Sequence, residues 1–170
     1  WRARMVVRSV GGSEPAPEDA LGRNPGSVGY GKGVPMGGDL PPAPDGATSP
    51  TFLVAALKDP LSGNLDRIQI IKGWVGGDGA MQEKIYDVVW AGDREPGDDG
   101  KVPLIGSTVD VPNATWTNTI GAPELITVWS DPDFDPALRA FYYARVIEIP
   151  TPRWSAYDAA YFADSDFPED

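Results

Sequence analysis

The chain contains no histidine and no cysteine among its 170 residues. Without histidine there can be no Ser-His-Asp triad, and the most common general base and the usual zinc ligand are also missing. Without cysteine there can be no disulfide, no thiolate metal site and no cysteine nucleophile. We therefore predict no catalytic residue and no cofactor for this chain.

Long apolar runs and clustered basic residues are also missing. No apolar run approaches the roughly 20 residues that a membrane-spanning helix needs, so no membrane partner is expected. The 14 Lys and Arg stand against 25 Asp and Glu, a net charge of −11. Nucleic acid is not expected as a partner, because its phosphates are bound by clustered basic side chains. The first five residues precede no apolar segment of the kind found in signal peptides, and localisation stays unknown.

Glycine and proline are abundant, at 20 and 18 residues, and 41% of the chain is hydrophobic. This composition predicts short elements joined by many turns around a real core. We predict one β-sandwich domain over residues 1–163, in which residues 11–50 are largely loop. Residues 164–170 form an acidic tail, expected to fray.

The longest β-branched run covers residues 65–75 and alternates between apolar and polar side chains. One side of an extended chain would carry Ile68, Ile70 and Trp74, with Lys72 as the exception, and the other Arg67, Gln69 and Ile71. This period of two indicates a strand with one dry face and one wetter face. Residues 76–79 are typical of a tight reversal, so we predict a hairpin of residues 66–75 with residues 82–91.

Other apolar segments bounded by Gly and Pro are also typical of strands. They cover residues 4–10, 51–58, 108–111, 124–129 and 141–149, and no helix of ordinary length is expected. The fold class predicted is all-β: an antiparallel β-sandwich, immunoglobulin- or jelly-roll-like, with long Pro/Gly-rich loops and little helix.

Residues 113–119 combine hydroxyl and amide side chains with an aromatic ring, as sugar-binding and ligand-binding loops often do. The candidate ligand-binding residues are Asn113, Thr115, Trp116, Thr117, Asn118 and Trp154. The alternative is a loop whose polar groups bond to one another.

Alternating aspartates at Asp131, Asp133 and Asp135 suggest weak calcium binding, because hard cations prefer carboxylate oxygens. An EF-hand loop would need Gly at Pro136 and Glu at Tyr142, and neither is present. The alternative is a turn in which Asp135 caps residues 136–140. A second acidic group, Asp93, Asp98 and Asp99, invites the same calcium hypothesis. We predict no other metal site.

Four segments in order, residues 33–40, 65–74, 114–125 and 141–154, resemble a bacterial family called domain of unknown function 3604. Full-length members are longer and are similar to the polymerase-and-histidinol-phosphatase superfamily of metal-dependent hydrolases. The resemblance implies metal ligands, mainly His and Asp, in an upstream barrel, and this chain resembles only the C-terminal part. Since the chain has no His, no catalytic residue is carried over.

Three functions are therefore expected as alternatives. The first is a non-catalytic C-terminal accessory domain or fragment of such a metallohydrolase. The second is a free-standing module that binds a glycan or small ligand, and the third is a hydrolase using carboxylate or hydroxyl groups. The partners expected are a missing catalytic domain, or a second copy bound through exposed apolar surface.

Overall fold

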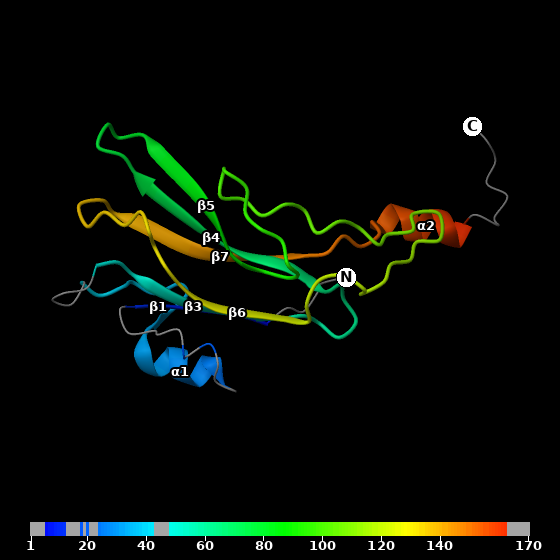
Figure 1. Cartoon of the computed structure of the whole chain (residues 1–170), viewed down its shortest axis with the longest axis horizontal. Coiled ribbons are helices and arrows are strands. Elements are labelled where there is room, and N and C mark those ends of the chain that lie inside the picture. Colours follow the sequence, from blue (N-terminus) through cyan, green and yellow to red (C-terminus); the bar gives the residue numbers. More distant parts are fainter. Residues whose placement is uncertain (1–5, 13–17, 19, 21–23, 43–47, 163–170) are drawn as a thin grey trace.

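The structure is a computed structural model that describes residues 6–12, 18, 20, 24–42 and 48–162 (Figure 1). One sheet contains β1 (Val6–Gly12), β2 (Val34–Pro35), β3 (Thr51–Leu57) and β6 (Glu124–Ser130), in the order β2-β1-β3-β6. The other contains β4 (Leu65–Val75), β5 (Met81–Trp90) and β7 (Ala140–Glu148), in the order β5-β4-β7. Every strand pair is antiparallel. The prediction of an all-β fold is confirmed.

The main core cluster takes its side chains from both sheets. From β3 come Phe52, Val54 and Ala56, from β6 comes Leu125, and from β4 come Leu65, Ile68 and Ile70. The rings of Phe52 and Tyr142, from β3 and β7, lie 4.7 Å apart between centroids. The two sheets therefore bury their apolar faces against each other, and Figure 1 shows β5-β4-β7 lying above β1-β3-β6.

The strand predicted over residues 65–75 is β4, the middle strand of its sheet, and it pairs with β5 as predicted. The register shifts after Ile68, which lies opposite Val89, whereas Gln69 lies opposite Asp87. Val88 is thus the extra residue of a β-bulge. The prediction that one face of β4 is wetter was wrong, because both faces are buried over most of its length. The segment after β5 covers the outer face, where the Arg67 guanidinium donates to the carbonyl of Val102 at 2.6 Å.

Two local predictions need correction. Residues 108–111 are not a strand: they contribute only an isolated bridge between Asp110 and Thr115. Within residues 11–50, α1 (Pro25–Lys32) forms a helix in a segment predicted to be largely loop. The side chain of Asn24 caps this helix by accepting the amide of Ser27 at 3.2 Å, and Pro25 starts it.

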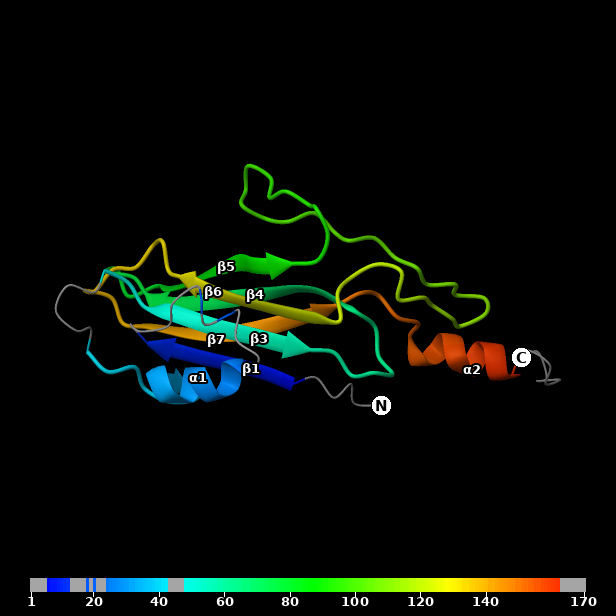
Figure 2. The same cartoon turned by 60° about the horizontal axis from the view of Figure 1, so that its bottom comes forward.

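The second helix, α2 (Trp154–Phe162), is also short. Figures 1 and 2 show it projecting beyond one end of the two sheets, away from the β4–β5 hairpin. Within the described ranges, neither helix is long and apolar enough to span a membrane. Residues 4 and 5 of the first predicted strand, and the tail at 164–170, lie outside the described residues.

Candidate functional site

The polar loop at residues 113–118 bonds mainly to its own neighbours. Asn113 donates from Nδ2 to the Asp110 carboxylate at 2.7 Å. The hydroxyl of Thr108 donates to the carbonyl of Thr117 at 2.6 Å and accepts its amide at 3.2 Å. Thr115 closes the loop through its backbone bridge to Asp110. These bonds favour the self-bonded loop among the two alternatives.

Asn118 fastens this loop to the turn before β4. Its Oδ1 accepts the Asn64 amide at 2.7 Å, and its Nδ2 donates to the Ser62 carbonyl at 3.2 Å. Trp116 is half-buried, whereas Trp154 at the start of α2 is 77% exposed. Figures 1 and 2 place the loop and α2 at the same end of the molecule. The ligand-binding role of these residues stays a prediction.

The aspartates after β6 form ion pairs with lysines from the other sheet. Lys72 donates from Nζ to Asp131 Oδ2 at 2.6 Å and to the carbonyl of Asp133 at 2.7 Å. Tyr142 donates its hydroxyl to the same Asp131 oxygen at 2.7 Å. Lys84 lies 2.5 Å from Asp133 Oδ2. The sequence signal for this cluster was Lys72, a charged residue between Ile70 and Trp74 on the apolar side of its strand.

This cluster changes the titration of its members. Burial, followed by the hydrogen bond to Asp131, raises the pKa of Tyr142 well above its usual value. Burial and the hydrogen bond to Asp133 raise the pKa of Tyr86 in the same direction. Hydrogen bonds from Lys84 and Tyr86 lower the pKa of the Asp133 carboxyl. The tyrosines thus stay protonated while the carboxylate is charged, an arrangement that joins the sheets but offers no free base.

The three aspartates of the calcium hypothesis have different partners. Asp131 and Asp133 face lysines, and Asp135 accepts the amide of Ala137 at 2.9 Å, so it caps the following turn. In the part of the chain that the structure describes, no three acidic side chains are grouped so that they could hold a metal ion.

A second charged network lies on the outer face of β4. Asp87 accepts from Arg67 at 3.1 Å, from Gln69 at 2.7 Å and from the backbone of Val102 at 2.8 Å. Arg94 donates to Asp66 at 2.6 Å. These buried carboxylates have their oxygens occupied by donors, which is how buried charges are stabilised in a folded protein.

The helix α2 carries aromatic side chains but has no buried residue. Trp154, Tyr157 and Tyr161 are 77%, 43% and 82% exposed. They occupy positions i, i+3 and i+7, which lie along one side of a helix. We call these three residues the α2 aromatic stripe. Exposed aromatic rings grouped in this way are a common feature of surfaces that contact a partner protein.

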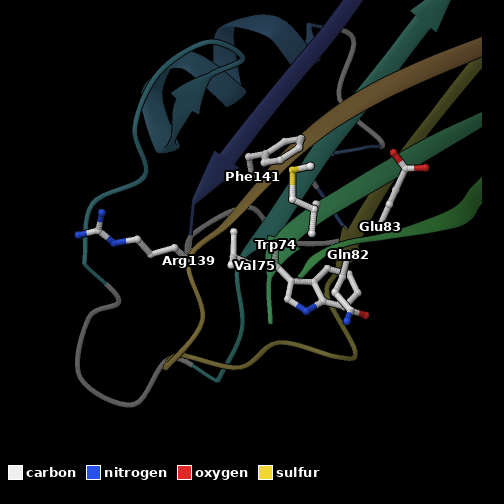
Figure 3. A pocket seen from close by; sticks show the side chains of 8 residues that line it. Trp74, Val75, Gln82, Glu83, Arg139 and Phe141 are labelled. Carbon is white, nitrogen blue, oxygen red and sulfur yellow. The ribbon is translucent and has the colours of Figure 1, made fainter. Parts of the chain in front are cut away.

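A pocket of about 310 Å³ lies at the opposite end of the molecule, where β4 ends and where β5 and β7 begin (Figure 3). Its apolar lining comes from Trp74, Val75, Met81 and Phe141, and its polar lining from Gln82, Glu83 and Arg139. In Figure 3, Glu83 and Arg139 lie on opposite sides of the lining, and Trp74 lies beside Gln82. The sequence did not predict this site, because three segments distant along the chain build it.

Comparison with known proteins gives one match. The family described as "Protein of unknown function (DUF3604)" has a sequence model that matches residues 2–170. No curated protein and no solved structure matches the chain. The family match therefore covers nearly the whole chain.

Proposed function

Since the chain belongs to the family of proteins of unknown function DUF3604, we propose that it is a non-catalytic accessory domain that docks onto a partner protein through α2. The partner is a catalytic domain of the metal-dependent hydrolase type that the sequence resemblance implies. The observation that carries the proposal is the α2 aromatic stripe, a row of exposed rings on a helix with no buried residue.

The short length of α2 supports docking. Helices shorter than about 12–15 residues are marginal in water unless tertiary packing stabilises them. The nine residues of α2 bury no side chain within this chain. A partner that covers Trp154, Tyr157 and Tyr161 would supply the missing packing energy.

The spacing of the stripe fits a known mode of recognition. Helices that bind in a groove use apolar anchors at positions such as i, i+3 and i+7. Trp and Tyr are the residues most often found as energetic anchors at interfaces, because each buries a large apolar ring and has one polar atom. The opposite side of α2 carries the small residues Ser155, Ala156 and Ala159, with Phe162 beside them.

The two buried carboxylates Asp87 and Asp131 support a structural role for the acidic residues of the sheets. Asp87 and Asp131 are buried and bonded to cationic side chains on neighbouring strands. A general base needs a carboxylate oxygen that can reach a substrate proton. These two carboxylates therefore act as structural ion pairs in this proposal.

The test is direct binding between the full chain and a His-containing barrel domain from a longer member of the family. Isothermal titration should give a saturable signal with the unmodified chain. Trp154→Ala and Tyr161→Ala should each weaken binding by at least about tenfold, as expected for hot-spot residues. Leu104→Ala is the control, because Leu104 is 87% exposed on a loop outside α2.

Two results would refute the docking proposal. One is that the barrel does not bind. The other is that Trp154→Ala and Tyr161→Ala bind as tightly as the unmodified chain. If light scattering instead shows self-association that both substitutions abolish, the stripe is an interface between copies of this chain and the hydrolase partner is wrong.

A further inference from the structure

In the pocket at the β4–β5 hairpin, the ring of Phe141 lies so close to Gly73 that a side chain at position 73 would displace it. A Cβ atom at Gly73 would lie 2.3 Å from Cζ of Phe141, far closer than two carbons can approach. The absence of this atom allows the Phe141 ring to lie over β4 from the neighbouring strand β7. Gly73 thus positions an aromatic ring at the pocket.

The aromatic surface here is larger than one ring. Phe141 and Tyr143 have centroids 6.3 Å apart and ring planes within 10° of parallel. Phe141 is 63% exposed and Tyr143 is 40% exposed, and Met81, which lines the pocket with Phe141, is 91% exposed. Side chains of this size are often buried, and exposed apolar surface is a common feature of binding sites.

The polar side chains of the pocket differ from the buried charged groups of the molecule. Asp87 and Asp131 have their donors in place. Among the residues that the structure describes, no hydrogen bond or ion pair engages the side chains of Gln82, Glu83 or Arg139. On the face of the sheet that carries Phe141, one carboxylate and one guanidinium are therefore available to a ligand as acceptor and donor.

We propose that this pocket binds a neutral sugar ring of a glycan. The apolar face of a pyranose packs on an aromatic ring, here Phe141, and its ring hydroxyls both donate and accept hydrogen bonds. Glu83, which shares the face of Gly73 and Phe141, accepts from these hydroxyls, and Arg139 donates to them. This set of residues is separate from the polar loop at 113–118.

The net charge of the chain and the volume of the pocket restrict the class of sugar that can bind. The chain has a net charge of −11, which disfavours sulfated and uronic-acid glycans over neutral ones. The volume of about 310 Å³ is at the lower limit of pockets that hold small ligands, which suits one sugar residue. The pocket is open to solvent, so the rest of the glycan can extend out of it.

The test uses saturation-transfer difference NMR on the full chain with methyl glycosides of glucose, galactose, mannose, N-acetylglucosamine and xylose, and methyl glucuronide as the anionic probe. At least one neutral glycoside should receive saturation, and the glucuronide should receive less. Phe141→Ala should weaken the affinity for that glycoside by about tenfold, the scale of a lost aromatic contact. Glu83→Gln should weaken it several-fold by removing a charged acceptor.

The matched control is Tyr30→Ala, which removes a comparably exposed ring (60%, against 63% for Phe141) from α1, outside both proposed sites. It should leave glycoside binding unchanged. Circular dichroism of each variant checks that the fold is retained. The proposal is overturned if no neutral glycoside binds, or if folded Phe141→Ala and Glu83→Gln both bind as the unmodified chain does. It is also overturned if Phe141→Ala changes only self-association.

Discussion

The ammonium group of Lys72 lies 2.6 Å from a carboxylate oxygen of Asp131, and their side chains are only 5% and 0% exposed. Lys72 belongs to the β5-β4-β7 sheet, and Asp131 directly follows the last strand of the other sheet. This ion pair therefore connects the two sheets at the end of their shared core. The ring of Trp74 lies 5.5 Å from the same ammonium group and helps to shield it from water.

Lys72→Met should lower the free energy of unfolding by about 3–5 kcal/mol, because it leaves the Asp131 carboxylate buried without its cation. Urea unfolding measures the change. Lys84→Met is the control, since the pair of Lys84 with Asp133 is about half exposed at both side chains. That substitution should cost at most about 1 kcal/mol. Equal losses for the two variants would contradict the structural role assigned to Lys72.

Stability should fall at alkaline pH because of Tyr142 and Tyr86. Tyrosines in the unfolded chain lose their protons near pH 10, whereas the raised pKa of each of these two keeps it protonated when folded. The stability that these two protonated hydroxyls give to the folded state is therefore complete below about pH 10 and is lost as the pH rises above it. Urea midpoints measured from pH 8 to 11 should show the fall. The Tyr142→Phe variant should have a lower urea midpoint than the unmodified chain at pH 8. Its midpoint should fall less between pH 8 and 11, because one of the two titrating hydroxyls is missing.

The sequence predicted β4 well because its pattern records burial directly. Ile68 and Ile70 lie on the core face as expected, and they are 0% and 1% exposed. The opposite face was predicted to be wetter, because Arg67 and Gln69 are polar. Their burial depends on Asp87 and on the carbonyl of Val102, partners that lie 18 to 35 positions further along the chain. Local periodicity does not contain such pairings.

The pocket could not be predicted from the sequence for the same physical reason. Gly73 weakens a strand when judged alone, and Phe141 belongs to a different strand 68 positions away. Only the pairing of β4 with β7 places Gly73 opposite Phe141. The helix α1 was missed despite a cap at Asn24 and a proline at Pro25, because the three glycines of this segment have low helix propensity.

Ile68→Ala and Ile70→Ala should each destabilise the protein by about 2–5 kcal/mol, the range for large-to-small substitutions in a packed core. Both side chains contact residues of the opposite sheet within the core cluster. Leu104→Ala should change stability by less than about 0.5 kcal/mol, since Leu104 is 87% exposed. Thermal or urea unfolding provides the measurement. A core variant as stable as the Leu104 variant would place that isoleucine outside the core.

Hydrogen exchange should separate α2 from the sheets in the chain without a partner. Amides of Trp154–Phe162 should exchange rapidly, because the helix is short and buries no side chain. Amides of β4 should exchange slowly, since β4 is bonded on both sides and buried. Addition of the docking partner should slow exchange in α2 and leave β4 unchanged. Strong protection of α2 in the chain alone would show that it is stable without being covered.

The effect of Gly73→Ala on stability should change sign with the residue at position 141. With Phe141 present, the new Cβ displaces the ring that lies 2.3 Å from it, and a loss of about 1 kcal/mol is expected. The three atoms nearest to this Cβ all belong to the Phe141 ring, so Phe141→Ala removes the clash. In that background, alanine should be more stable than glycine by roughly 0.5–1 kcal/mol, because glycine loses more backbone entropy on folding. Urea unfolding of the four proteins in this double-mutant cycle measures the coupling, and additive effects would show that Phe141 does not lie over Gly73 in solution.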